Sequence, residues 1–133
     1  MSETEVTHKY ISSGASLPKW SNPISHAVVA GNMCFVSGQL SVSLEGEYVP
    51  GTVREEASRA FANFFAALEA SGFTKDEVVF VDIAFDDLSC VEEVNALFME
   101  LFPEGQRPAR TIYEVAALPF GGKVKVMGTA VRK

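Results

Sequence analysis

The segment between Thr52 and Gly72 places the strongest constraint on the fold of this 133-residue chain. Its apolar residues recur at the three- and four-residue spacings that put side chains on one face of a helix. They are Ala57, Ala60, Phe61, Phe64, Phe65 and Leu68. Three phenylalanines in one stripe need a broad apolar surface to pack against, most naturally a sheet. We therefore interpret the stripe as core and not as a ligand site.

Local signals mark the ends of two predicted helices. Thr52 and Glu55 fit a capping box, in which a hydroxyl and a carboxylate satisfy free amides of the first turn. Gly72 is placed to end this helix, because glycine readily adopts the left-handed conformation found there. Ser89 and Glu92 repeat the capping-box pattern and predict the start of a second helix. The buried face of that helix is predicted to carry Val91, Val94, Phe98 and Leu101, and Pro103 cannot continue it.

The remaining apolar runs read as strands. A short strand is expected around Thr7–Ile11, and the runs HAVVA and MCFVSG form a hairpin across Gly31-Asn32, two residues suited to a tight turn. Val78–Phe85 is rich in valine and reads as a further strand. The last third is predicted to hold strands at Arg110–Leu118 and Lys123–Arg132, and the Lys/Val alternation in KVKV is typical of a sheet with one wet face.

Apart from the short first strand, the element order is β-β-α-β-α-β-β. This order predicts an α+β fold, in which residues 1–133 form one domain with a mixed sheet and both helices on one face. The other face of the sheet would then carry apolar side chains without a covering layer. A homo-oligomer is the economical way to cover it.

Composition excludes several classes of function. The net charge of −6 argues against binding nucleic acid or an anionic membrane. The two cysteines, Cys34 and Cys90, lie far apart and read as reduced thiols of a cytoplasmic protein. The first ten residues do not resemble a secretory signal, and no apolar run is long enough to span a bilayer. No phosphate-binding glycine motif, HExxH or cysteine cluster is present, so neither a cofactor nor a metal is expected.

Two stretches are candidates for chemistry. In the first, Ser37 and Gly38 end a buried strand, where the glycine permits close backbone approach to a ligand and the serine offers a donor or acceptor. The alternative is an ordinary strand end. In the second, Arg110, Ile112 and Glu114 alternate along a strand and share a face. The planar guanidinium of Arg110 is suited to binding a carboxylate with two parallel hydrogen bonds. The alternative is that Arg110 forms a salt bridge, either with Glu114 or with a neighbouring subunit.

The other ionisable candidates are weaker. His8 and His26 stand alone in the sequence, and a lone histidine is more often a surface or structural residue than a catalytic one. Asp86 and Asp87 follow a strand and precede a helix. We interpret them as turn and cap residues and not as a catalytic pair.

Across nearly its whole length, the chain resembles the Rid/YjgF family, also known as endoribonuclease L-PSP. The resemblance lies in Gly31-Asn32 followed by FVSGQL, in SGFTKDEVV, in Val94-Asn95-Ala96, in Phe102, and above all in RPARTIYEVAALP with the closing AVRK. The string PAR-x-x-x-EV-x-x-LP is a fairly specific hallmark. The resemblance implies a chorismate-mutase-like fold and a homotrimer with clefts between subunits.

The resemblance also implies a reaction and a site. Deaminating members hydrolyse 2-imino or enamino acids to 2-keto acids and ammonia. By resemblance, Arg110 would bind the substrate carboxylate, Ser37 and Gly38 would line the pocket, and Asn95 would sit at its rim. An imine carbon is already electrophilic, so a site needs only to orient it, place a water and handle protons.

Three departures separate this chain from the deaminating members. Ile24, Ile112 and Met127 stand where the family has a tyrosine, a cysteine and a glutamate. Such a pocket would favour a carboxylate with a larger apolar body and activate water less well. His26 or Glu114 could substitute as proton carrier, although no residue is identified as the acid or base. The alternative function is a non-catalytic trimer that binds small carboxylates such as 2-keto acids. A ribonuclease is disfavoured, because the chain is acidic and lacks a histidine pair or metal motif.

Overall fold

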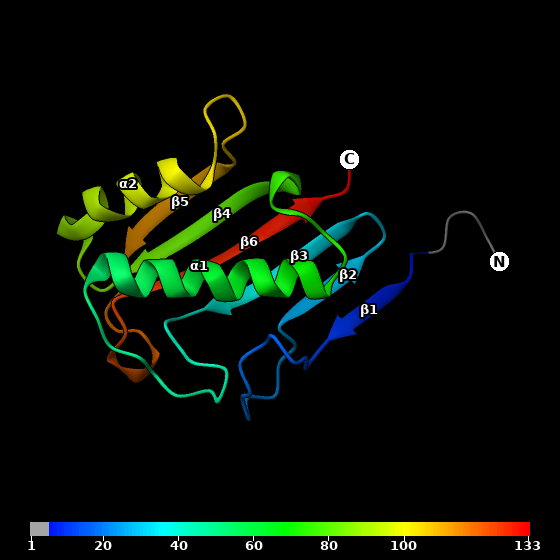
Figure 1. Ribbon diagram of the computed structural model, residues 1–133, viewed down its shortest axis with the longest axis horizontal. Coiled ribbons are helices and arrows are strands. Elements are labelled where there is room, and N and C mark those ends of the chain that lie inside the picture. Colours follow the sequence, from blue (N-terminus) through cyan, green and yellow to red (C-terminus); the bar gives the residue numbers. More distant parts are fainter. Residues whose placement is uncertain (1–5) are drawn as a thin grey trace.

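The computed structural model describes residues 6–133 as one layer of sheet and one layer of helix (Figure 1). The six-stranded sheet has the order β1-β2-β3-β6-β4-β5, in which β4 and β5 are parallel and all other neighbours are antiparallel. Its strands are β1 (His8–Ile11), β2 (Ala27–Ala30), β3 (Met33–Gln39), β4 (Val78–Phe85), β5 (Ala109–Glu114) and β6 (Val124–Val131). The helices are α1 (Val53–Ala70) and α2 (Val91–Leu101), with 3-10 turns η1 (Lys75–Glu77), η2 (Leu88–Cys90) and η3 (Pro119–Gly121). The predicted α+β fold is confirmed.

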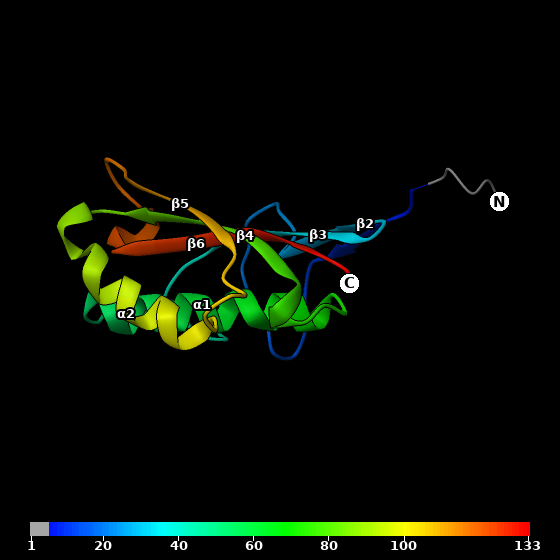
Figure 2. The same cartoon turned by 90° about the horizontal axis from the view of Figure 1, so that it is seen from above.

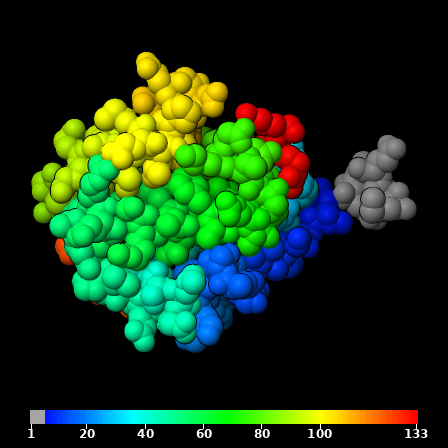
Figure 3. Space-filling view, in the orientation of Figure 1, coloured from blue at the N-terminus to red at the C-terminus, as the bar shows by residue number. Residues whose placement is uncertain are grey.

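Both helices lie on the same side of the sheet, as the sequence predicted (Figure 2). In the space-filling view from that side, α1 crosses the centre of the molecule and α2 lies beside it (Figure 3). Phe61 and Phe64 of α1 are buried against the sheet, and the ring of Phe61 also packs edge-on against Phe98 of α2. The aromatic stripe is therefore core, as predicted.

Both predicted ends of α1 are confirmed. The Thr52 hydroxyl accepts a hydrogen bond from the backbone N–H of Glu55, and the Glu55 carboxylate accepts one from the N–H of Thr52. At the other end, Gly72 has a φ of +82°. The Gly72 N–H donates to the carbonyl oxygen of Glu69, and the Phe73 N–H donates to the carbonyl oxygen of Leu68. This pair of bonds is the Schellman arrangement, which a left-handed residue makes possible.

The predicted capping box of the second helix is wrong. Asp87, and not Ser89, supplies the cap: its side chain accepts the Ser89 N–H at 3.0 Å and the Ser89 hydroxyl at 2.7 Å. The Ser89 hydroxyl is thus occupied as a donor, the chain first forms η2, and α2 begins at Val91 without a side-chain cap. The interpretation of Asp87 as a cap residue is confirmed.

The last two strands are shorter than predicted. β5 ends at Glu114 instead of Leu118, because β4, its neighbour in the described sheet, ends opposite it at Phe85. The following residues form a bend and η3. β6 occupies Val124–Val131, one residue shorter at each end than expected.

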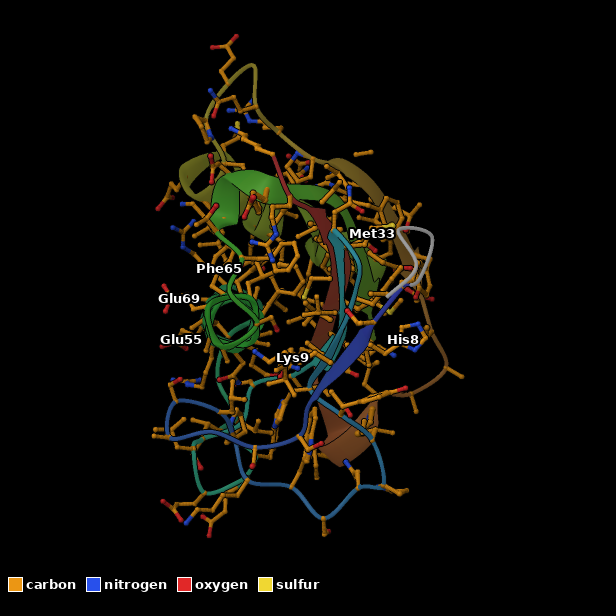
Figure 4. All side chains as sticks on the ribbon, turned by 90° about the vertical axis from the view of Figure 1, so that its right-hand side faces the viewer. His8, Lys9, Met33, Glu55, Phe65 and Glu69 are labelled. Carbon is orange, nitrogen blue, oxygen red and sulfur yellow. The ribbon has the colours of Figure 1, made fainter. Side chains whose placement is uncertain are left out.

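Within residues 6–133, the face of the sheet opposite the helices has no covering layer (Figure 2). Alternate residues of each strand point to that side, so in Figure 4 His8 lies on the open side while Lys9 lies on the side of α1. Tyr10, Phe35, Tyr113 and Met127 neighbour core residues along their strands and are themselves exposed. We call this surface the open face. No helix in the described part of the chain is long and apolar enough to cross a membrane.

Candidate functional site

Arg110 lies at the edge of the sheet, on the side that faces the helices. Its guanidinium carbon is 4.8 Å from the centroid of the Phe98 ring of α2, a distance at which a cation is attracted to the face of an aromatic ring. Burial lowers the pKa of Arg110 from its ordinary value, and the nearby charge of Glu92 acts in the opposite direction. An arginine remains protonated at physiological pH despite such a shift. The strand therefore presents a fixed, half-buried cation.

The surface hollow beside Arg110 has a volume of about 410 Å³ and contains a second guanidinium, that of Arg107. Arg107 is anchored by a hydrogen bond from its Nε to the carbonyl oxygen of Phe102. Asn95 projects into the same hollow, where its Nδ2 donates to Glu92 at 3.3 Å. The Asn95 Oδ1 is buried and accepts no hydrogen bond from residues 6–133. The sequence-predicted pair Arg110 and Asn95 is thus brought together, and Arg107 is an addition that sequence reasoning missed.

Arg110 forms no ion pair with any residue that the structure describes. Glu114, the predicted intramolecular alternative, instead accepts a hydrogen bond from the backbone N–H of Leu88 at 2.9 Å. An unpaired arginine beside an aromatic ring and an amide is suited to bind an incoming carboxylate with two parallel hydrogen bonds.

Ser37 and Gly38 lie at the far end of β3, where the register against β6 shifts between Val36 and Gln39. The Ser37 hydroxyl donates to the carbonyl oxygen of Ser25 at 2.6 Å and so ties down the loop before β2. Gly38 lies beneath the side chain of Lys125: a Cβ at position 38 would stand 2.8 Å from Lys125 Cδ. The glycine therefore makes room for a lysine stem.

A second hollow, of about 420 Å³, opens beside Gly38. We call it the Trp20 pocket. Its lining includes Trp20, Ile24, Gly38, Leu40, Phe120 and Lys125. The predicted residues Ile24 and Gly38 share this pocket, whereas Arg110 and Asn95 line the other one.

His26 does not line the Trp20 pocket but contacts Trp20, which does. The imidazole ring is fully buried and stacks on the Trp20 indole, with centroids 3.7 Å apart. Its Nε2 bonds to the carbonyl oxygen of Pro18 at 2.8 Å, so Nε2 carries the proton, and Nδ1 faces the Gln39 amide nitrogen at 3.5 Å. Burial lowers the pKa of His26, against a smaller opposing effect of the Pro18 bond. We conclude that His26 is a neutral residue that positions Trp20.

The other two predicted wall residues lie apart from both hollows. Ile112 packs against the hydrophobic core from the helix side of β5, and Met127 lies on the open face opposite Asp82 of β4. A single chain therefore does not gather Ile24, Ile112 and Met127 around Arg110. Among residues 6–133, no group of three or more His, Cys, Asp or Glu side chains could hold a metal ion.

Sequence reasoning missed Trp20, Phe120 and Lys125. The KVKV alternation did place Lys125 on a wet face, but only strand pairing puts it across Gly38. Trp20 is the only tryptophan of the chain and lies in the loop SLPKWSNPIS, which offers no periodicity to indicate its direction. Phe120 has a φ of +64°, a conformation that the sequence PFGG does not assign to the phenylalanine.

The family model described as endoribonuclease L-PSP matches residues 15–132 of this chain. The chain belongs to the Rid/YjgF family. A Rid/YjgF relative from Bos taurus, named 2-iminobutanoate/2-iminopropanoate deaminase, is 37% identical over 130 residues, covering 97% of this chain and 93% of its own. A RutC family protein from Pyrococcus abyssi is 38% identical over 103 residues, covering 77% of this chain and 80% of its own.

Solved Rid/YjgF structures show the same fold. The YjgF gene product of E. coli superimposes with a TM-score of 0.86 at 32% identity, covering 94% of this chain and 99% of its own. A putative endoribonuclease from Thermotoga maritima superimposes with a TM-score of 0.87 at 37% identity, covering 94% and 98%. The expected family and its chorismate-mutase-like fold are thus confirmed.

Proposed function

We propose that this protein is a Rid-type deaminase, which hydrolyses a 2-imino or enamino acid to a 2-keto acid and ammonia. The observation that carries the proposal is the half-buried guanidinium of Arg110, which has no ionic partner in the described chain and lies beside Asn95. Relatives from Bos taurus and Capra hircus, each 37% identical, are named 2-iminobutanoate/2-iminopropanoate deaminase. The two free cysteines, Cys34 and Cys90, favour action in the cytoplasm.

Hydrolysis of an imine needs few catalytic groups from the protein. Water adds to the carbon of the C=N bond, the nitrogen gains protons and leaves as ammonia, and the carbon becomes the carbonyl of the keto acid. Arg110 would hold the carboxylate next to that carbon. A fixed carboxylate restricts the orientation of the imine, and orientation lowers the barrier by reducing the entropy lost in the reaction.

We further propose that the active unit is a homotrimer with its sites in clefts between subunits. Within one chain, Arg110 and Gly38 line different hollows, so a shared site needs a second chain. The exposed apolar residues of the open face, Tyr10, Phe35, Tyr113 and Met127, supply a surface on which copies of the sheet can pack. The predicted roles of Ser37, Gly38, Ile24, Ile112 and Met127 depend on this assembly.

The second candidate is a non-catalytic trimer that binds small carboxylates such as 2-keto acids. One observation favours it: among the described residues, no aspartate or glutamate lines the pocket that contains Ile24 and Gly38, and the nearby His26 has both ring nitrogens engaged. A water placed there would have no general base within one chain.

Hydrolysis of 2-imino acids generated in the assay by an amino acid oxidase tests the first candidate. Side chains should range from methyl to branched and aromatic. We expect faster ammonia release with the native protein and a loss of about 30-fold or more with Arg110→Ala, because a charge-assisted hydrogen-bonded contact contributes about 2 kcal/mol. Arg54→Ala is the charge-matched control, since Arg54 pairs with Glu100 on the outer surface and lines neither the hollow beside Arg110 nor the Trp20 pocket.

Each possible result has a distinct meaning. If the Arg54→Ala variant accelerates imine hydrolysis and the Arg110→Ala variant does not, the result supports the deaminase function. A second result is that the native protein accelerates the hydrolysis of no imino acid, while calorimetry shows that 2-keto acids bind in an Arg110-dependent way. That result would favour the non-catalytic carboxylate-binding trimer over the deaminase. Absence of both would refute the assignment of Arg110 as a carboxylate site.

A further inference from the structure

We propose that the substrate of the site around Arg110 is a 2-imino dicarboxylate, and that Arg107 binds its second carboxylate. The inference deepens the proposed function and rests on it for the role of Arg110 as the first carboxylate site. It differs from the sequence-based expectation of a larger apolar body, which depended on Ile24, Ile112 and Met127. Arg107 thereby becomes the residue that selects among 2-imino acids.

The hollow beside Arg110 holds more positive than negative charge. Arg107 and Arg110 both line it, and Glu92 is the carboxylate that it contains among residues 6–133. Neither arginine forms an ion pair within the described chain. Three residues of extended chain span at most about 11 Å, so these two side chains can reach the two ends of one small ligand. An anion is therefore favoured in this hollow, although the net charge of the chain is −6.

Glu92 lies at the Arg110 end of the hollow and away from Arg107. Burial lowers the pKa of Arg110, and the charge of Glu92 opposes this shift, so the two charges act on each other. Arg107 instead bonds through Nε to the carbonyl oxygen of Phe102 at 3.1 Å. Glu92 is in the first turn of α2 and Phe102 follows its last residue, a separation of about 15 Å along the helix axis. The charge of Arg107 thus remains available to an anion.

The direction of Arg107 is set by its neighbours in the chain. Pro108 follows it, and a residue before proline is restricted to extended backbone conformations. The Nε bond to Phe102 uses one of the five donors of the guanidinium, and Arg107 makes no other side-chain hydrogen bond within residues 6–133. Both Nη groups therefore remain free to bind a carboxylate with two parallel hydrogen bonds.

The two ends of the hollow offer different groups to a ligand. At the Arg110 end, Asn95 Oδ1 is a buried acceptor without a donor among residues 6–133. The N–H of an imine lies next to the first carboxylate and can supply that donor, whereas a distal carboxylate brings only acceptors. The distal carboxylate therefore belongs at Arg107, which supplies donors. Phe98 and Met99 line the same hollow and give the methylene groups of the ligand an apolar surface.

Calorimetric titration of the full-length protein with 2-oxoglutarate, the stable keto-acid product of a substrate of this class, tests the inference. The comparison ligand is the 2-oxo acid in which an isopropyl group replaces the distal carboxylate, which keeps the shape and removes the charge. We expect 2-oxoglutarate to bind more tightly by about tenfold or more, the factor that one charge-assisted hydrogen bond supplies. Arg107→Gln should remove this preference, and Arg107→Glu should reverse it. Arg54→Gln is the control and should keep it, because Arg54 pairs with Glu100 and does not line this hollow.

The ratio of the two affinities separates this inference from the proposed function. Equal binding of the two acids, tighter binding of the isopropyl analogue, or a preference that survives in Arg107→Gln overturns the inference and leaves Arg110 as a carboxylate site. If neither acid binds the native protein, the inference and the carboxylate site fall together. An Arg107-dependent preference supports the inference whether or not imines are hydrolysed, which the ammonia assay decides separately. Misfolding of a variant lowers the binding of both acids alike and so leaves the ratio unchanged.

Discussion

Glu56 is a buried, ionised side chain at the start of α1. Its carboxylate accepts hydrogen bonds from the hydroxyl of Tyr48, the backbone N–H of Gly51, and both the backbone N–H and the ammonium of Lys123. These bonds link α1 to the loop before it and to the start of β6. A buried charge tolerates its loss of hydration only when it is bonded in this way.

Replacing Glu56 should destabilise the protein to a degree that depends on what the new residue can accept. Glu56→Ala leaves several donors without an acceptor and should cost about 3 kcal/mol, whereas Glu56→Gln keeps one acceptor and should cost about 1–2 kcal/mol. Urea unfolding at pH 7 measures both. Equal stability of Glu56→Ala and the native protein would show that the network contributes nothing.

The contribution of Glu56 should also depend on pH. Burial by itself raises the pKa of this carboxyl, but the hydrogen bonds from Tyr48, Lys123 and Gly51 outweigh it and hold the pKa below its ordinary value of 4.5. A folded-state pKa below the unfolded one gives stability that is complete above the unfolded value and is lost as pH falls through the folded value. The stability gap between native protein and Glu56→Gln should therefore stay constant from about pH 7 to 5 and narrow below about pH 4. A gap that widens in acid would contradict this.

The packing of α1 on the sheet depends on Gly128 in the middle of β6. A Cβ at that position would meet the carbonyl oxygen of Phe80 in the neighbouring strand and would stand 3.0 Å from the ring of Phe64 on α1. The glycine lets helix and strands approach closely. The need arises at the contact between three elements and is not visible within β6 alone.

Gly128→Ala should destabilise the protein by about 2–3 kcal/mol, since the inserted methyl group displaces backbone and core. Gly72→Ala is the matched control. It has a φ of +82° but nothing within 4 Å of a new Cβ, so only the left-handed strain of about 1 kcal/mol applies. Thermal or urea unfolding should rank the two variants in this order. The reverse order would mean that the sheet relaxes around the added methyl group.

At the scale of the whole molecule, the open face is the surface through which we propose that copies of the chain assemble. Phe35 of β3 is 46% exposed there, and Leu44, in the loop after β3, is 48% exposed. If the open face holds the proposed trimer together, Phe35→Glu buries a charge in each interface and should shift the mass measured by light scattering from trimer to monomer. Leu44→Glu should leave the mass unchanged. A native protein that is already monomeric would exclude the trimer.

The sequence alone determined the elements and their arrangement in layers. The α1 stripe, its capping box and the Gly72 terminus were all predicted, because each depends on residues within one or two turns. The capping box predicted at Ser89 was wrong for a local reason as well. Asp87, only two residues away, accepts the hydrogen bond from the Ser89 N–H and supplies the cap in its place. The ends of β5 and β6 were misplaced because a strand extends only as far as its neighbour does.

Only the tertiary structure decided which candidate residues meet. The sequence suggested one pocket around Arg110, whereas the folded chain places Arg110 with Asn95 and Arg107, and places Ile24 and Gly38 with Lys125 and Trp20. Lys125 follows Gly38 by 87 positions and reaches it because β6 pairs with β3. Local periodicity gives the direction of a side chain from its own strand. Which side chain lies opposite depends on strand order and register, and these are set by the packing of the whole sheet against its helices.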